Sequence, residues 1–199
     1  MMPRAKLEQA QSRLLAAGLS LFARHGTERV NSNTIARAAR LGIGTFYSHF
    51  ADKHALLHEI QLRTLAALRQ ARLAAIRDGS ADSIDSANPA DQVRRAVEAA
   101  VHFAEQHPEA YRVTFGREKA GAAKHGPVVS ESSRPTAQAL RQLQNEGRLP
   151  ADLDVDLAAR AYLSMEIGML LWWLEDPSRA SKAGLADTLA RLHPAAGVG

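Results

Sequence analysis

The sequence contains no cysteine, and this absence removes several classes of function at once. Without a thiol, the chain cannot form a disulfide scaffold, a thiolate metal site, a cysteine nucleophile or a cysteine redox switch. Aromatic residues make up only 5% of the 199 residues, and valine and isoleucine are scarce beside alanine, leucine, arginine, glutamate and glutamine. That balance favours helix over strand along the whole chain.

Long apolar runs are lacking as well. The first residues, MMPRAKLEQAQSR, are polar and basic and contain no apolar stretch of the kind found in a secretory signal. The most apolar segment, residues 157–174, is interrupted by Arg160, Ser164 and Glu166. This segment therefore predicts a buried helix and not a membrane span, and we expect a cytoplasmic protein.

Positive charge gathers at the N-terminal end. Residues 1–54 hold eight Lys/Arg and three Asp/Glu, whereas residues 55–199 hold 17 Lys/Arg and 18 Asp/Glu. A basic segment on a nearly neutral body is typical of a nucleic-acid-binding protein, although a solvated surface gives the same pattern. The motifs have to decide between the two.

Apolar residues at helical spacing, with good capping residues between them, predict an all-α chain of about nine helices. The predicted helices cover residues 7–25, 32–39, 42–50, 52–77, 89–106, a stretch from 108, 128–146 with a possible kink at Pro135, 154–175 and 182–192. Residues 78–88 and the segment GREKAGAAKHGP are expected to be irregular, and the final HPAAGVG is expected to fray.

The stretch GIGTFYSHF, residues 42–50, mixes glycine, aromatic and hydroxyl residues without a formal charge. Two short helices joined by a tight turn at Arg40–Leu41, after an apolar helix, predict a helix-turn-helix unit whose second helix enters the major groove. We expect its core to contain Phe46, Phe50, Ile35, Ala36, Ala39 and Leu41. Thr45, Tyr47, Ser48 and His49 remain for the outer face and the phosphates, and Gly44 allows close approach to base edges.

Residues 14–57, LLAAGLSLFARHGTERVNSNTIARAARLGIGTFYSHFADKHALL, resemble the N-terminal domain of TetR-family transcriptional regulators. The portion GTFYSHFADKHALL carries the most specific part of the resemblance. Two positions depart from the family: Arg40 stands where glycine is most common, and Gly42 stands where a serine cap is common. A positive φ at Arg40 would cost roughly 1 kcal/mol.

The resemblance implies a set of DNA contacts. Ser32 and Asn33 would reach DNA from the start of the second helix, with Asn33 as the base reader. Ile43, Gly44 and Thr45 would lie against base edges, while Tyr47, Ser48, His49 and Lys53 would hold phosphates.

The resemblance also implies a homodimer on a palindromic operator, associated with the bacterial nucleoid. Residues 154–175 and 182–192 would form the dimer interface as a four-helix bundle across a two-fold axis. The middle helices would enclose a pocket for an unknown small hydrophobic effector, with candidate lining residues Phe103, Tyr111, Phe115, Met165, Met169 and Trp172. For any one of these six side chains taken alone, an ordinary core position is the better interpretation.

The function predicted from the sequence is a ligand-released repressor. Residues 1–54 would form the DNA-binding domain, with the helix-turn-helix at about 31–50, and residues 55–199 the ligand-binding and dimerisation domain. The alternatives are a transcriptional activator of the same family, a sequence-neutral architectural DNA binder, and a helical carrier or enzyme with a vestigial head. The chain has no GxSxG elbow, phosphate-binding loop or dinucleotide fingerprint, so no enzyme, catalytic residue, cofactor or metal site is predicted.

Overall fold

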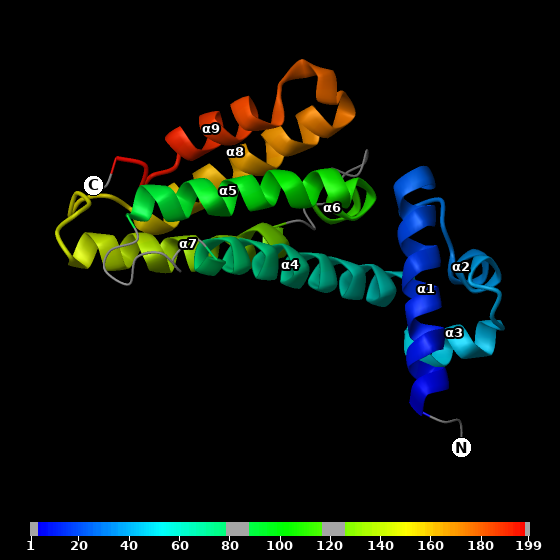
Figure 1. Cartoon of the computed structure of the whole chain (residues 1–199). Helices are drawn as coiled ribbons and strands as arrows, with labels where there is room; N and C mark the ends of the chain where they lie inside the picture. The colour runs from blue at the N-terminus through cyan, green and yellow to red at the C-terminus, as the bar shows by residue number, and fades with distance from the viewer. Residues whose placement is uncertain (1–3, 79–87, 117–125, 198–199) are drawn as a thin grey trace. The chain divides into compact units, whose positions relative to one another are not determined.

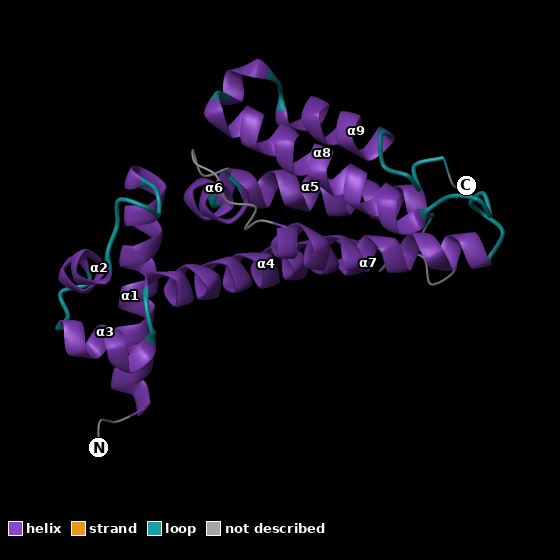
Figure 2. Cartoon of the chain, turned by 180° about the vertical axis from the view of Figure 1, so that it is seen from behind, coloured by secondary structure: helices purple, strands orange, loops and turns teal. Residues whose placement is uncertain are grey.

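The computed structural model describes residues 4–78, 88–116 and 126–197, and this part of the chain consists of helices joined by short loops (Figure 1). Within the described residues there are nine α-helices, one short 3-10 helix and no strand. The view from behind, coloured by secondary structure, shows this helical architecture (Figure 2). The helices are α1 (Arg4–His25), α2 (Ser32–Ala38), α3 (Ile43–His49), α4 (Lys53–Asp78), α5 (Pro89–Gln106), α6 (Pro108–Phe115), α7 (Gly126–Asn145), α8 (Val155–Glu175), η1 (Pro177–Arg179) and α9 (Lys182–Arg191). The all-α prediction is confirmed. The expected irregular segments lie mostly outside the described residues.

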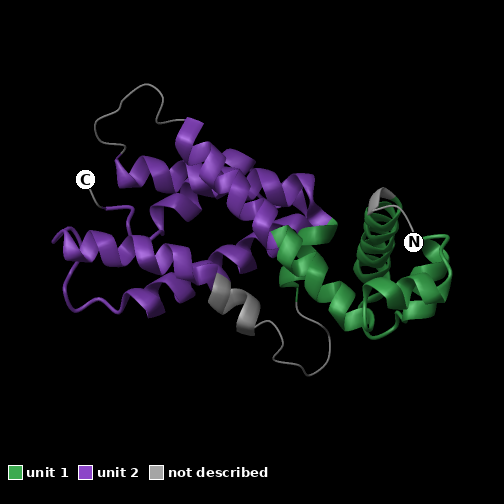
Figure 3. Ribbon diagram, turned by 90° about the horizontal axis from the view of Figure 1, so that it is seen from below, with its two compact units in different colours: residues 1–64, 109–122 green, residues 65–108, 123–199 purple. Residues whose placement is uncertain are grey.

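The chain divides into two compact units (Figure 3). The head unit comprises residues 1–64 and 109–122, and the body unit comprises residues 65–108 and 123–199. Helix α4 therefore contributes its first part to the head unit and its second part to the body unit. The sequence predicts a boundary between a DNA-binding domain and a ligand-binding domain at residues 54 and 55. That division of functions stays a prediction.

Capping side chains fix where four helices begin. Asn31, Asp52, Asn88 and Asp154 each accept a hydrogen bond from a backbone N–H two or three residues further on, at 2.8 to 3.0 Å. Such bonds satisfy donors that the first turn of a helix leaves without an intrahelical partner. The capping residues expected from the sequence between the helices are thus confirmed at these four positions.

The core of the head unit is a small apolar cluster. Ile35 and Phe46 are fully buried, and Leu14 of α1 and Leu56 of α4 are equally inaccessible to solvent. The predicted core residues Ala36, Ala39 and Phe50 are also buried, and Leu41 packs against them half-buried. Helices α1, α2 and α4 thus form a well-packed core that holds α3 in place.

Two expectations about the body unit needed revision. Helix α7 begins at Gly126, two residues before the predicted start, and continues through Pro135 to Asn145. The expectation of a frayed tail is wrong for residues 193–197, which form turns. Ala195 is 2% exposed, and the His193 ring packs edge-on against Tyr162 with ring centroids 4.5 Å apart.

Burial explains how this tail can dock on a helix. It lowers the pKa of His193 to about 4, so the imidazole is neutral at pH 7 and packs as an apolar ring. The hydroxyl of Tyr162 donates to the carbonyl of Leu189 on α9 at 3.1 Å, which ties the same region to the last helix.

A buried ion pair joins α4 to α8 inside the body unit. Arg72 donates to Oε1 of Glu166, whose side chain is only 1% exposed. The second carboxylate oxygen of Glu166 is buried and finds no hydrogen-bond partner among the described residues. An incompletely bonded carboxylate in the interior depends strongly on its charged partner.

Replacing Arg72 by Met should therefore lower the free energy of unfolding by about 3–5 kcal/mol, because the Glu166 charge would lose its compensation. The double variant Arg72→Met/Glu166→Leu removes both charges and should recover most of this loss. Urea denaturation of the purified proteins gives both values. Equal losses in the single and double variants would contradict this explanation, because the loss would then not arise from an uncompensated charge on Glu166.

Candidate DNA-binding interface

A left-handed turn joins α2 to α3. The N–H of Leu41 donates to the carbonyl of Ala36, and the N–H of Arg40 donates to that of Arg37, both at 2.9 Å. This pair of bonds is the Schellman motif that commonly ends a helix, and it needs a residue with positive φ. Here that residue is Arg40, with φ of 54°. The turn predicted at Arg40–Leu41 is confirmed.

Helix α3 has a buried face and an exposed face. Phe46 is fully buried and Phe50 is 6% exposed, whereas Tyr47 is 58% exposed and Ile43 is 37% exposed. A side-chain carbon placed at Gly44 would meet no atom within 4 Å, so the backbone there borders open space. An apolar and hydroxyl-bearing face that no other described residue of the head unit covers is suited to contact another molecule.

The other predicted DNA contacts from α2 and α3 differ in their exposure to solvent. Asn33 is exposed and Ser32 half-buried in the first turn of α2. On α3, Thr45 is half-buried, and the Ser48 hydroxyl donates to the Thr45 carbonyl at 2.8 Å. The Ser48 oxygen keeps lone pairs that can accept a further bond, while its proton is already used.

Two residues predicted to bind phosphates, His49 and Lys53, have side-chain nitrogens that are buried or hydrogen-bonded within the head unit. Nε2 of His49 is buried without a hydrogen-bond partner in the described part of the chain. Nζ of Lys53 donates to the carbonyl of Thr27, between α1 and α2, at 2.7 Å. An ammonium group has three donors, so Lys53 can hold this carbonyl and still offer N–H groups. Both phosphate assignments stay predictions.

An alanine at position 44 should change the stability of the protein and its affinity for DNA in opposite directions. Gly44→Ala should raise the free energy of unfolding by about 0.5–1 kcal/mol, because alanine favours helix and the site has room. The added methyl group would point into the space that base edges should occupy, so operator affinity should fall about tenfold or more. Thermal unfolding and a fluorescence binding titration measure the two effects. Unchanged affinity would remove Gly44 from the interface.

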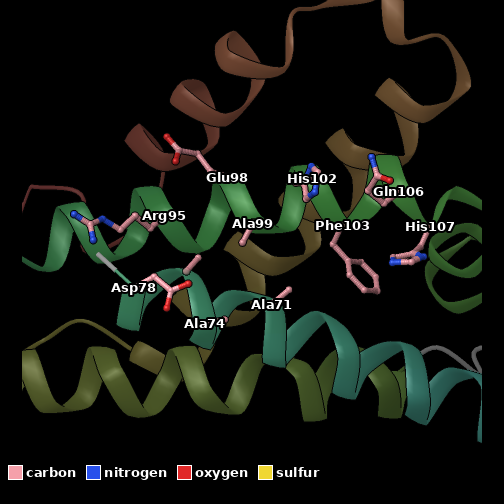
Figure 4. A pocket seen from close by; sticks show the side chains of 11 residues that line it. Ala71, Ala74, Asp78, Arg95, Glu98, Ala99, His102, Phe103, Gln106 and His107 are labelled. Atoms are coloured by element: carbon pink, nitrogen blue, oxygen red, sulfur yellow. The ribbon is translucent and has the colours of Figure 1, made fainter. Parts of the chain in front are cut away.

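The body unit contains an open groove of about 710 Å³ between α4 and α5 (Figure 4). Its lining residues are Ala71, Ala74, Ala75 and Asp78 of α4, residues Arg95, Glu98, Ala99, His102, Phe103 and Gln106 of α5, and His107. Figure 4 shows Phe103 pointing from α5 toward the α4 side, with His107 beside it. The ring centroids of Phe103 and His107 are 4.7 Å apart. The lining thus combines alanines and one phenylalanine with charged and polar side chains.

Of the six residues predicted to line a ligand pocket, only Phe103 lines this groove. Tyr111 and Phe115 belong to the head unit, where both are buried and their ring centroids are 4.6 Å apart. On α8, Met165 and Met169 are half-buried and Trp172 is 41% exposed. The alanines at positions 71, 74 and 75 were missed. Their signal is small residues at helical spacing, which leave room beside a helix.

Helix α8 keeps an exposed stripe along one side. Its members recur every three or four residues and are Leu157, Ala161, Ser164, Gly168 and Trp172, with Leu157 at 65% exposure. A side-chain carbon at Gly168 would meet nothing within 4 Å. The guanidinium of Arg179 lies over the Trp172 ring at 5.3 Å from its centroid. Helix α8 therefore exposes apolar residues in addition to those that face the core.

The described residues contain no group of three or more histidine, aspartate or glutamate side chains placed to hold a metal ion. None of the helices in the described ranges is long and apolar enough to cross a membrane.

A three-helix base, a helix-turn-helix with an exposed second helix and a separate helical body define the class of helix-turn-helix transcriptional regulators. Two family models match the sequence: "Bacterial regulatory proteins, tetR family" over residues 14–60 and "Tetracyclin repressor-like, C-terminal domain" over residues 86–193. The chain belongs to the tetR family of bacterial regulatory proteins, and it is a DNA-binding transcriptional regulator. The family resemblance noted in the sequence is confirmed.

Solved structures share the fold along nearly the whole chain. The fatty acid degradation regulator FadR from Bacillus halodurans is 15% identical with a TM-score of 0.73, and the match covers 94% of this chain and 95% of that one. A TetR-family regulator from Syntrophomonas wolfei is 15% identical with a TM-score of 0.75, covering 96% of each chain. The complex of SmeT with triclosan is 19% identical with a TM-score of 0.70, covering 96% of this chain and 94% of the other. A search of the curated proteins found no match.

Proposed function

We propose that this regulator is a repressor that binds a palindromic operator as a homodimer and leaves it when a small apolar effector binds. The observation that carries the proposal is the face of α3, where Tyr47 and Ile43 are exposed while Phe46 on the opposite side is fully buried. A helix anchored on one side and uncovered on the other can lie in a major groove. Residues 1–54 would form the DNA-binding domain and residues 55–199 the ligand-binding and dimerisation domain.

The dimer is supported by the exposed stripe of α8. Leu157 and Trp172 are large apolar side chains in contact with solvent, and Gly168 between them would let a second helix approach closely. Helix α9 would take part as well, through residues 182–192. A two-fold dimer matches a palindromic operator, because each subunit then reads one half-site. Such a protein would act in the cytoplasm, on the nucleoid.

The effector would occupy the groove of the body unit. Its volume of about 710 Å³ lies in the range of small-molecule sites, and three alanines of α4 form one wall. One of the related structures holds triclosan, and two others come from regulators named for fatty acid metabolism. A lining that combines alanines and a phenylalanine with charged residues suits an apolar molecule with one polar end. Its differential affinity for the two states of the dimer would set how far it releases DNA.

The first test is selection of bound duplexes from a random DNA pool by the purified protein at two salt concentrations. Enrichment of a two-fold symmetric site, with discrimination kept at the higher salt, would support a dimeric sequence-specific regulator. Binding without symmetric enrichment that vanishes as salt rises would contradict the proposal, because phosphate contacts alone behave in that way. Transcription from a promoter carrying the selected site then separates a repressor from an activator of the same family.

Asn33 should read one base position. Asn33→Ala is expected to cost about 1–3 kcal/mol of discrimination at that position and little elsewhere, because an amide reads adenine through two hydrogen bonds. Asn31→Ala is the matched control: the Asn31 side chain caps α2 through the Thr34 N–H at 2.9 Å, so its loss should weaken binding to all sequences alike. Titration against single-base operator variants measures both. Equal losses on every sequence for Asn33→Ala would sink the assignment.

A further inference from the structure

A guanidinium from α1 reaches across to the turn that precedes α3. Nη2 of Arg13 donates to the carbonyl of Ala39 and, at 3.3 Å, to the carbonyl of Arg40. These carbonyls follow the Schellman bonds that close α2, so they lie where the chain has already left the helix. A cation at this place also interacts favourably with the negative end of the helix dipole.

The two carbonyls stand on either side of one α-carbon, that of Arg40. Rotation about φ of Arg40 turns the peptide group carrying the Ala39 carbonyl, and rotation about ψ turns the group carrying its own carbonyl. One donor atom that holds both oxygens therefore restrains both rotations. Arg40 has φ of 54°, which an L-residue disfavours by about fivefold to thirtyfold in population. Restraint is needed here because the glycine that usually fills such a position is absent.

We propose that Arg13 is a positioning residue for DNA recognition. It holds the turn at Arg40 in the left-handed conformation and thereby fixes the direction in which α3 leaves the base of the head unit. In this role the Arg13 side chain donates hydrogen bonds to backbone carbonyls of the protein and does not bind a DNA phosphate. The inference rests on the proposed function for its effect on DNA, whereas its effect on the turn can be measured without DNA.

Three variants separate this role from a phosphate contact. Arg13→Gln removes the bridging guanidinium. Arg13→Gln/Arg40→Gly also replaces the strained residue by one that adopts positive φ freely. Arg13→Gln/Arg40→Ala is the matched control, because it removes the same charge at position 40 but keeps a β-carbon. Thermal unfolding confirms that each full-length variant is folded.

Hydrogen exchange of the Arg40 and Leu41 amides, measured on the free protein, reports on the turn. Arg13→Gln should exchange these amides about tenfold faster than the wild type. The Gly variant should recover most of the protection and the Ala variant none. Unchanged protection in Arg13→Gln would overturn the proposal, whatever the DNA result.

Binding to the selected operator and to an unrelated duplex, at several salt concentrations, reports on recognition. Arg13→Gln should weaken operator binding about tenfold with little change on the unrelated duplex, and only the Gly double variant should regain affinity. The reverse pattern would overturn the proposal: equal loss on both duplexes, a salt slope reduced by about one unit and no rescue by glycine indicate a phosphate contact. A wild type that selects no operator would refute the proposed function, while the exchange data would still decide the role of Arg13.

Discussion

The direction of α3 depends on one backbone conformation, the positive φ at Arg40. The two Schellman hydrogen bonds close α2 at this residue, and the buried ring of Phe46 seats α3 against the same core. A shift of the turn would move Gly44 and Tyr47 together, since both belong to one rigid helix of two turns. Recognition of base edges tolerates such a shift poorly, because hydrogen-bond geometry in the groove is fixed. The exposed face can therefore work only if this turn is held.

The body unit is organised around a different constraint, the buried charge of Glu166. Its pairing with Arg72 joins α4 to α8, the helix that carries the exposed stripe proposed for dimerisation. The groove proposed for the effector lies beside Ala71 and Ala75, on the same stretch of α4. A ligand that changes the packing of this stretch would act on an element in contact with α8. This gives the body unit a physical route by which effector binding and dimer geometry can influence each other.

Most of the helices could be predicted from local signals. Capping side chains such as Asn31 and Asp154 satisfy donors within three residues, so they can be read from short sequence windows. The buried Phe46 and the exposed Tyr47 of α3 follow from helical periodicity in the same way, whereas His49 was expected on the outer face and has its Nε2 buried. These features depend on neighbours along the chain, and sequence alone therefore defines them.

The features that sequence missed depend on distant partners. The Lys53 ammonium binds a carbonyl at Thr27, and the C-terminal turn at His193 docks on Tyr162 of an earlier helix. No periodic pattern reports such pairs, because each is decided by how helices meet. The groove was missed for a related reason. Alanines line it because their small side chains leave room beside the helix, whereas the sequence prediction looked for large apolar side chains such as Met165.

The measurement that tests the central claim most directly is the change in backbone amide chemical shifts when the protein is titrated with its selected operator. If α3 is the recognition helix, the largest changes fall on residues 43–48 and on Ser32 and Asn33, and they persist at moderate salt. If the largest changes fall elsewhere on the basic head, with residues 43–48 unaffected, the account of how this regulator reads DNA is contradicted.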